Sequence, residues 1–175
     1  MNISIRLATY ADKQDMANIH SRSWEVAYKD IIPVEYIKKR SAVRTVKWER
    51  ILSAENRIHH IILNDNTAVG MVTVGPPQQE DIEIKNDIGI DHSFWELHGI
   101  YLHPDYYRSG IGTIALEFAM NKARAAGKTN MLLWVFEDNL NAIKFYEKCG
   151  FAPDGASKIY NFGKEINCIR MRRSL

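Results

Sequence analysis

The sequence predicts a mixed α/β (α+β) fold, in which helices flank a central β-sheet that contains both parallel and antiparallel strands. Two segments, residues 57–75 and 158–171, each have the β-rich runs and the intervening turn residues of a hairpin. Between them, a strand, a helix and a second strand in residues 93–136 form one crossover unit, which makes these two strands parallel. The 175 residues, 46% of them apolar and 25% charged, suffice for one core, so we expect a single domain over residues 1–175.

The first half of the chain has the patterns of one strand, several short helices and a hairpin. ISIRLA, residues 3–8, alternates with the period of a half-buried strand, and TYAD, residues 9–12, has the form of a capping box ahead of a helix. Residues 21–53 stay helical in pieces, with Pro33 suited to the first turn of a new helix. The strands RIHHIILN and TAVGMVTVG then follow, joined by the turn dipeptide DN.

The second half alternates strands and helices. An acidic loop over residues 80–91 precedes SFWELHGIYL, whose alternation and aromatic content predict a central strand. A helix follows from Gly110 to the glycine stop in AAGK, and NMLLWVF is then a buried strand. DNLNAIKFYEKCG predicts a capped helix that ends at Gly150, and KIYNFGKEINCIRM predicts a final hairpin.

Composition excludes several classes of partner and site. The 23 basic and 21 acidic residues leave a net charge of +2, too small to indicate nucleic acid or a membrane surface as the main partner. The longest apolar run, MLLWVF, is far shorter than the roughly 20 residues of a membrane helix, and MNISIRLATYADK lacks a signal-peptide core. Cys149 and Cys168, as buried thiols, suit a reducing compartment, and the histidines lack metal-ligand spacing. We therefore expect a cytoplasmic protein without a metal ion.

Gly110 and Gly112 stand at the start of the predicted central helix, where glycine costs about 1 kcal/mol relative to alanine. A helix start binds phosphate when bare backbone lets the ligand approach its unpaired N–H groups. The glycine pair also fits two alternatives. One is a junction that needs a positive φ. The second is the dinucleotide fingerprint G-x-G-x-x-G/A in GIGTIA, with Glu137 and Asp138 as ribose ligands of an NAD-dependent oxidoreductase.

Two features weigh against the dinucleotide fingerprint. The loop HPDYYRS, residues 103–109, separates the strand from Gly110, where the fingerprint requires a tight turn. Only residues 113–175 follow Gly112, too few to complete a dinucleotide-binding half and to add a catalytic half.

IYLHPDYYRSGIGTIAL, followed later by NLNAIKFYEKCGF, resembles the GNAT superfamily of N-acetyltransferases, and the order of expected elements is similar to that family from residue 3 to about residue 173. The second signature of the family, Asn-x-x-Ala-Ile-x-Phe-Tyr-x-x-x-Gly-Phe, is matched in full over residues 139–151. The first, [Arg/Gln]-x-x-Gly-x-[Gly/Ala], is matched at Gly110 and Gly112, but its opening position holds Tyr107. The resemblance implies a GNAT-like sheet and an acyltransferase that uses acetyl-CoA as co-substrate.

The resemblance also implies which residues bind acetyl-CoA. Backbone N–H groups at the helix start would cradle the pyrophosphate: Arg108, Ser109, Gly110, Ile111, Gly112 and Thr113. The backbone of Ile100, Tyr101 and Leu102 would pair with the pantetheine arm. Asn139 resembles the family residue that holds this arm; as an N-cap it could serve both purposes.

Two groups around the reacting carbonyl follow from the same resemblance. Tyr146 stands where family members place the tyrosine that protonates the coenzyme A thiolate, and its alternative is core packing beside Phe145. A backbone N–H near Ile100 or Tyr101 would stabilise the oxyanion.

A proton acceptor is needed because a primary amine is protonated near neutral pH. Glu96 lies where histone-acetylating relatives carry the general base. Strand alternation puts its side chain on one face with His98, Ile100 and Leu102. Solvation or an arginine partner would also account for a glutamate here. Other members place a glutamate base where this chain has Trp134, so Glu96, His98 or a water chain stays open as the base.

In this family the helices after the first strand line the acceptor site, so the resemblance implies Trp24, Tyr28 and Glu96 as substrate-binding residues. Aromatic residues at this spacing also serve as core packing. The acidic loop would attract a cationic acceptor such as a polyamine or aminoglycoside, or else form a solvated surface. Its carboxylates are Glu80, Asp81, Glu83, Asp87 and Asp91.

We expect transfer of the acetyl group of acetyl-CoA to the primary amine of a small molecule, by direct attack in a ternary complex. Three alternatives stay open: acetylation of a protein N-terminal amine or lysine, a coenzyme-A-binding module without catalysis, and the NAD-dependent oxidoreductase. A homodimer also stays open, because dimers are common in the superfamily.

Overall fold

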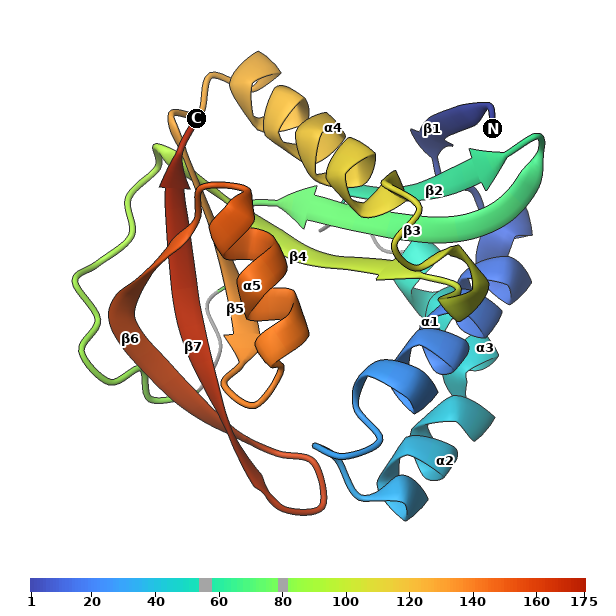
Figure 1. Ribbon diagram of the computed structural model, residues 1–175, viewed down its shortest axis with the longest axis horizontal. Helices are drawn as coiled ribbons and strands as arrows, with labels where there is room; N and C mark the ends of the chain where they lie inside the picture. The colour runs from blue at the N-terminus through green and yellow to red at the C-terminus, as the bar shows by residue number, and fades with distance from the viewer. Residues whose placement is uncertain (54–57, 79–81) are drawn as a thin grey trace.

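The computed structural model describes residues 1–53, 58–78 and 82–175, and its strands form one seven-stranded sheet (Figure 1). The strand order is β1-β2-β3-β4-β5-β7-β6; β4 and β5 are parallel, and every other neighbouring pair is antiparallel. The predicted mixed α/β fold is therefore confirmed. The strands are β1 (Ile3–Leu7), β2 (Ile58–Asn64), β3 (Thr67–Gly75), β4 (Phe94–Leu102), β5 (Asn130–Phe136), β6 (Ala152–Asn161) and β7 (Glu165–Ser174). The helices are α1 (Lys13–Ala27), α2 (Val34–Ala42), α3 (Arg44–Leu52), α4 (Ile111–Ala125) and α5 (Leu140–Lys148), with 3₁₀ turns η1 (Tyr10–Asp12) and η2 (Pro104–Tyr106).

Helices cover both faces of the sheet. Met71 of β3 packs with Met16 of α1 on one face, and the adjacent Val72 packs with Leu116 of α4 on the other. Adjacent strand residues point to opposite faces, so the apolar run in β3 contributes to two core layers. Within the part of the chain that the structure describes, no helix is long and apolar enough to cross a membrane.

Local sequence signals set the element boundaries. The carboxylate of Asp12 accepts hydrogen bonds from the backbone N–H of Thr9 at 2.7 Å and from its hydroxyl at 3.0 Å, which caps the first helical segment as TYAD predicts. Asp65 and Asn66 have φ values of 47° and 70°, as a two-residue type I′ turn between antiparallel strands requires. Arg57, the first residue of the predicted second strand, lies outside the described residues.

A β-bulge interrupts β4 at His98. Leu97 pairs with Val74 of β3 and Gly99 pairs with Thr73, so His98 is an extra residue without an opposite partner. The extra residue changes which side chains share a face. Glu96 therefore lies on the face of α1, with Tyr101, whereas Ile100 and Leu102 lie on the face of α4. The expectation that Glu96 shares a face with Ile100 and Leu102 is wrong, because the bulge shifts the alternation by one residue.

The two parallel strands of the sheet part after a short stretch of pairing. The last paired residues are Leu97 of β4 and Leu133 of β5. Beyond them β4 continues along β3 as far as Leu102, and β5 continues along β7 as far as Phe136. In the described structure, the facing edges of β4 and β5 therefore have no strand partner beyond this point, where the two strands diverge (Figure 1).

His60 of β2 is 3% exposed, and its ring packs edge-on against Phe118 of α4, with ring centroids 4.8 Å apart. Burial, with a smaller effect of Lys122, lowers the pKa of His60 from 6.5 to about 4. Because the folded pKa lies below the unfolded one, the unfolded chain binds the proton more tightly, and the contribution to stability is lost as pH falls from 6.5 toward 4. We expect this histidine to remove about 2 kcal/mol from the free energy of unfolding between pH 8 and pH 5.

Urea denaturation of the wild type and of His60→Leu at the two pH values measures this effect. The variant cannot take up the proton, so its free energy of unfolding should fall by about 2 kcal/mol less between pH 8 and pH 5. Comparing each protein with itself removes the cost of the core substitution. An equal fall in both proteins would contradict the buried neutral histidine.

Candidate active site

The start of α4 presents a row of backbone N–H groups. Gly110 is the N-cap residue with a φ of 85°, and Arg108 has a φ of 59°, so the chain turns sharply just before the helix. Among the described residues, no acceptor binds the backbone N–H groups of residues 108–112, whereas the N–H of Thr113 donates to Gly110 O at 3.1 Å. Neighbouring unpaired donors at the positive end of a helix dipole fit a pyrophosphate group.

The two glycines of this turn meet different needs. Gly110 needs its positive φ, and a Cβ there would meet nothing within 4 Å. Gly112 has no such φ; its Cβ would lie 3.6 Å from Phe145 Cζ and 3.9 Å from Leu102 Cδ1, which is ordinary contact. The conformational need of the junction therefore accounts for Gly110. The protein itself does not require a glycine at position 112, where the bare backbone lies between α4, β4 and α5.

The hydrogen-bond pattern of β4 shows which backbone groups face the parted edge. The N–H of His103 donates to Val69 O at 2.8 Å, so these two residues form a hydrogen-bonded pair with β3. Such pairs alternate along antiparallel strands, and Tyr101 is therefore also bonded to β3. The N–H and C=O groups of Ile100 and Leu102 point the other way, toward the edge that β5 has left.

Tyr146 lies on α5, with its ring against Phe145 and Phe151 at centroid distances of 5.1 and 5.9 Å. Burial is the main cause that raises the pKa of its hydroxyl above the ordinary value of 10, and Tyr101 contributes to the rise. The phenol therefore remains protonated at physiological pH. Tyr28 is a second neutral tyrosine: its hydroxyl forms a side-chain hydrogen bond with Tyr101, and burial raises its pKa as well.

Asn139 and Tyr107, one in each family signature, both make side-chain contacts within the protein. The side chain of Asn139 accepts a hydrogen bond from the N–H of Ala142 at 3.3 Å, so the residue is the N-cap of α5. The hydroxyl of Tyr107 lies 3.2 Å from Ser23 Oγ and thus joins the loop before α4 to α1. Tyr107 therefore replaces the signature side chain with a contact to α1.

Glu96 and His98 meet on the α1 face of β4, where the side chains are 11% and 5% exposed. Glu96 Oε1 lies 3.0 Å from His98 Nδ1, and Glu96 Oε2 accepts a hydrogen bond from the N–H of Gln78 at 3.1 Å. His98 Nε2 lies 3.2 Å from the carbonyl oxygen of Pro76. The glutamate is thus neither solvated nor paired with an arginine, the two ordinary situations of a strand carboxylate.

Trp24 and Tyr28 belong to an aromatic cluster that joins α1 to the β6–β7 hairpin. Tyr28 packs edge-on against Phe136 of β5 at 4.8 Å, and Trp24 packs in the same way against Phe162 at 5.9 Å. Phe136 and Phe162 also contact each other at 5.5 Å. Neither phenylalanine was expected from the sequence, because neither belongs to a family signature and only the fold brings them to Trp24 and Tyr28.

Two contacts tie the exposed acidic loop to the sheet. Asp87 Oδ1 lies 2.8 Å from Arg170 Nη1 of β7, and Lys85 forms a backbone bridge with Ser157 of β6. Arg170 is 1% exposed and also binds Asp154 at 2.7 Å. Glu80 and Asp81 lie outside the described residues. At least one of the carboxylates expected to attract a cationic acceptor is therefore neutralised by the protein.

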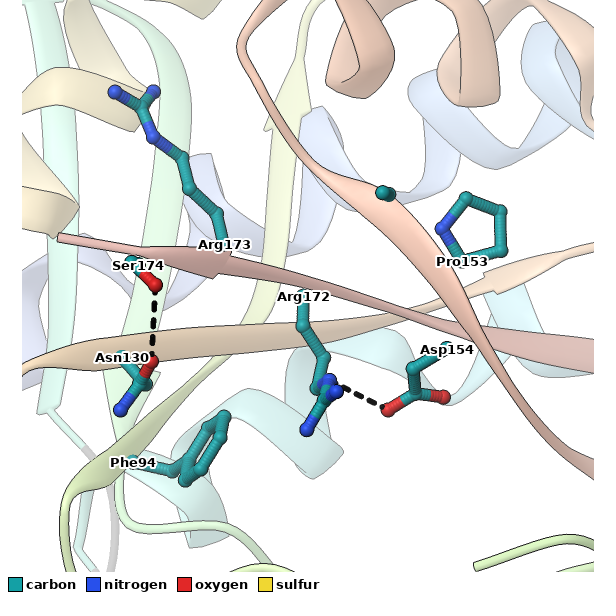
Figure 2. A pocket seen from close by; sticks show the side chains of 8 residues that line it. Phe94, Asn130, Pro153, Asp154, Arg172, Arg173 and Ser174 are labelled. Atoms are coloured by element: carbon teal, nitrogen blue, oxygen red, sulfur yellow. Dashed lines mark hydrogen bonds and ion pairs between the residues drawn. The ribbon is translucent and has the colours of Figure 1, made fainter. Parts of the chain in front are cut away.

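A cavity of about 280 Å³ opens at the other end of the parallel pair, where β4 and β5 begin (Figure 2). Figure 2 shows Arg172 of β7 bound to Asp154, and Ser174 bound to Asn130, on its walls. The cavity lies at the starts of the strands whose other ends lead to the α4 turn and Tyr146. It therefore does not belong to the candidate active site.

A parted pair of parallel strands, free N–H groups at a helix start and a partly buried, protonated tyrosine define the class of protein: an acyltransferase with a site for a pyrophosphate-bearing thioester. The model of the acetyltransferase (GNAT) family matches residues 13–151, and the chain belongs to this family. It is therefore an N-acetyltransferase, and the predicted enzyme class and acetyl-CoA as co-substrate are confirmed.

Individual relatives agree with this assignment. The N-acetyltransferase YuaI of Bacillus subtilis is 26% identical over 97% of this chain and 89% of its own length. The spermidine N(1)-acetyltransferase of Thermoplasma acidophilum is 24% identical over 86% of this chain and 89% of its own. The PaiA N-acetyltransferase of Thermoplasma acidophilum, solved with coenzyme A, has the same fold with a TM-score of 0.76 at 22% identity, over all of both chains. Membership of this family weighs against an NAD-dependent oxidoreductase as the interpretation of GIGTIA.

Proposed function

We propose that this N-acetyltransferase acetylates the primary amine of a small molecule, by direct attack of the amine on acetyl-CoA in a ternary complex. The observation that carries the proposal is the parting of β4 from β5 after Leu97 and Leu133, beside the α4 start and Tyr146. A pantetheine arm can pair with the backbone of Ile100 and Leu102 there, as a strand would.

We assign one residue of the chain to each proton transfer and to the stabilisation of the oxyanion. Glu96 removes a proton from the ammonium group, directly or through water, and the neutral amine attacks the thioester carbonyl carbon. The N–H of Ile100 donates to the oxyanion as the C–N bond forms. The C–S bond then breaks, and Tyr146 gives its hydroxyl proton to the thiolate. The new amide nitrogen loses its extra proton, which restores the Tyr146 hydroxyl directly or through water. The products are the acetylated amine and coenzyme A.

The aromatic cluster supports a small acceptor. Trp24, Tyr28, Phe136 and Phe162 gather side chains from α1, β5 and the final hairpin into one apolar group at the α1 face, where Glu96 also lies. Such a wall suits a compact molecule with an apolar or cationic part. The name of the spermidine N(1)-acetyltransferase among the relatives agrees with a small amine. A single domain, a cytoplasmic location and a homodimer stay predictions.

A thiol-release assay with acetyl-CoA tests the acceptor class. The panel contains polyamines, aminoglycosides, amino acids and simple aromatic amines beside lysine-containing and free N-terminal peptides. We expect kcat/KM for at least one small amine to exceed that for every peptide by at least about 10-fold, because a compact wall cannot accommodate a peptide backbone as well. Peptides acetylated faster than every small amine would make this a protein acetyltransferase, and binding of acetyl-CoA without transfer to any amine would support a non-catalytic module.

A further inference from the structure

The geometry points to a shared proton between Glu96 and His98, and we propose that the two residues act as one proton-accepting unit. The proposal rests on the proposed function, because that function gives Glu96 the role of base. Its new content is His98 as the residue that positions the Glu96 carboxylate and holds the proton jointly with it.

Hydrogen-bond accounting requires the shared proton. His98 Nε2 faces the carbonyl oxygen of Pro76 at 3.2 Å, and a carbonyl only accepts, so Nε2 must carry a hydrogen. His98 Nδ1 faces Glu96 Oε1 at 3.0 Å. Without a second proton, a nitrogen lone pair would face carboxylate lone pairs in a site that is nearly closed to water. One proton therefore lies between Nδ1 and Oε1, in addition to the proton on Nε2.

The fold holds both partners in place. The bulge at His98 turns its side chain to the same face as Glu96, where the position of a Cβ on Gly75 would be 3.9 Å from His98 Nε2. The N–H of Gln78 binds the other carboxylate oxygen at 3.1 Å. Two backbone groups from the segment after β3 thus fix the pair from outside, one at each residue.

No further charge on the neighbouring strands competes for this proton, within the described residues. By register, Glu96 lies beside Gly75 of β3 and Leu132 of β5, and Gly99 after the bulge lies beside Thr73. One strand further out, His59 of β2 is hydrogen-bonded to Thr73 Oγ1 at 2.9 Å, and Arg172 of β7, beside Leu132, is paired with Asp154 at 3.0 Å. From α1, the ring of His20 packs against Tyr101 at 4.3 Å, and burial lowers the pKa of His20. The proton is therefore controlled by the pair itself.

The pair has a consequence for catalysis. With its proton in place, the unit has no net charge and is a poor base. After this proton passes to solvent water, the unit carries one negative charge and can take a proton from the substrate ammonium. The proton then returns to its place between Nδ1 and Oε1 as the amine becomes neutral, so charge and protons balance. Substitution of either residue removes the same proton-accepting unit, so the losses of kcat in the two single variants should not multiply in the double variant.

A double-mutant cycle tests the unit. We expect Glu96→Gln to lower kcat about 100-fold and His98→Gln about 10- to 100-fold, and the double variant to be within about 3-fold of Glu96→Gln alone. His92→Gln, at an exposed histidine in the loop before β4, is the matched control and should retain wild-type activity. All variants should bind acetyl-CoA with unchanged Kd in calorimetry. Losses that multiply in the double variant would overturn the unit.

¹⁵N NMR of the histidine rings tests the proton itself and does not require an identified acceptor. In the wild type, we expect His98 Nε2 to carry a hydrogen and Nδ1 to show a strong hydrogen bond that disappears in Glu96→Gln. An unprotonated Nε2, or a ring signal unaffected by Glu96→Gln, would overturn the shared proton. If the ring signals agree but Glu96→Gln remains fully active, the shared proton stands and the proposed role of Glu96 as base is wrong.

Discussion

Tyr146→Phe is expected to lower kcat by about 100-fold or more while leaving the Kd of acetyl-CoA unchanged. The substitution removes only the hydroxyl, and the ring keeps its contacts with Phe145 and Phe151. Because burial raises the pKa of Tyr146, the hydroxyl is a protonated donor at every pH used for assay, and no other acid of the described chain replaces it in the proposed mechanism. Initial rates of thiol release, together with calorimetric titration of acetyl-CoA, measure the two effects.

Tyr10→Phe is the matched control, because it removes a tyrosine hydroxyl that binds Glu49 at the molecular surface. Its kcat should equal that of the wild type. A Tyr146→Phe variant with more than half of the wild-type kcat would contradict the acid role. Loss of acetyl-CoA binding in this variant would instead assign the hydroxyl to binding of the thioester.

Gly112→Asp is expected to weaken acetyl-CoA binding about 100-fold without loss of thermal stability. A carboxylate in the first turn of α4 would repel the pyrophosphate, and like charges about 5 Å apart cost roughly 1–3 kcal/mol each near a protein surface. The same carboxylate interacts favourably with the positive end of the helix dipole, so the fold is not weakened. Calorimetry and thermal unfolding give the two quantities.

Gly112→Asn separates charge from size, because its side chain has nearly the same shape as aspartate. We expect its Kd for acetyl-CoA to rise much less than that of Gly112→Asp, and the difference between the two variants should shrink in high salt. Equal effects of both substitutions would mean that the pyrophosphate does not lie at this helix start.

Much of the fold could be predicted from the sequence because several signals are local. The DN turn requires two residues with positive φ, and Asp65 and Asn66 adopt them. The helix start at Gly110 and the cap at Asn139 likewise depend on residues a few positions apart. Such signals can be interpreted without knowing what lies across the sheet.

Signals that depend on a neighbouring strand could not be predicted in this way. The bulge at His98 exists only in the pairing of β4 with β3, so alternation alone put Ile100 and Leu102 on the wrong face. β6 begins at Ala152, well before the predicted hairpin. The sequence prediction missed this start because Pro153 and Gly155 are typical of a loop, whereas the strand accommodates them at an irregularity between Pro153 and Ser157.

In the candidate site, too, some features follow from local sequence and others only from the fold. The family signatures lead to the α4 start and to Tyr146, whereas Phe162 and the contact of His98 with Glu96 emerge only from the folded chain. The alternation of hydrogen-bonded pairs along β4 also distinguishes Ile100 from Tyr101, which the sequence left as equal candidates for the oxyanion donor. The N–H of Ile100, rather than that of Tyr101, faces the parted edge and is the better candidate for the oxyanion.

Calorimetric titration of the purified protein with acetyl-CoA, and separately with NADH, tests the central claim most directly. The free N–H groups at the α4 start and the parted edges of β4 and β5 predict one acetyl-CoA per chain and no binding of NADH. Absence of acetyl-CoA binding, or tight binding of NADH in its place, would contradict this account of the site.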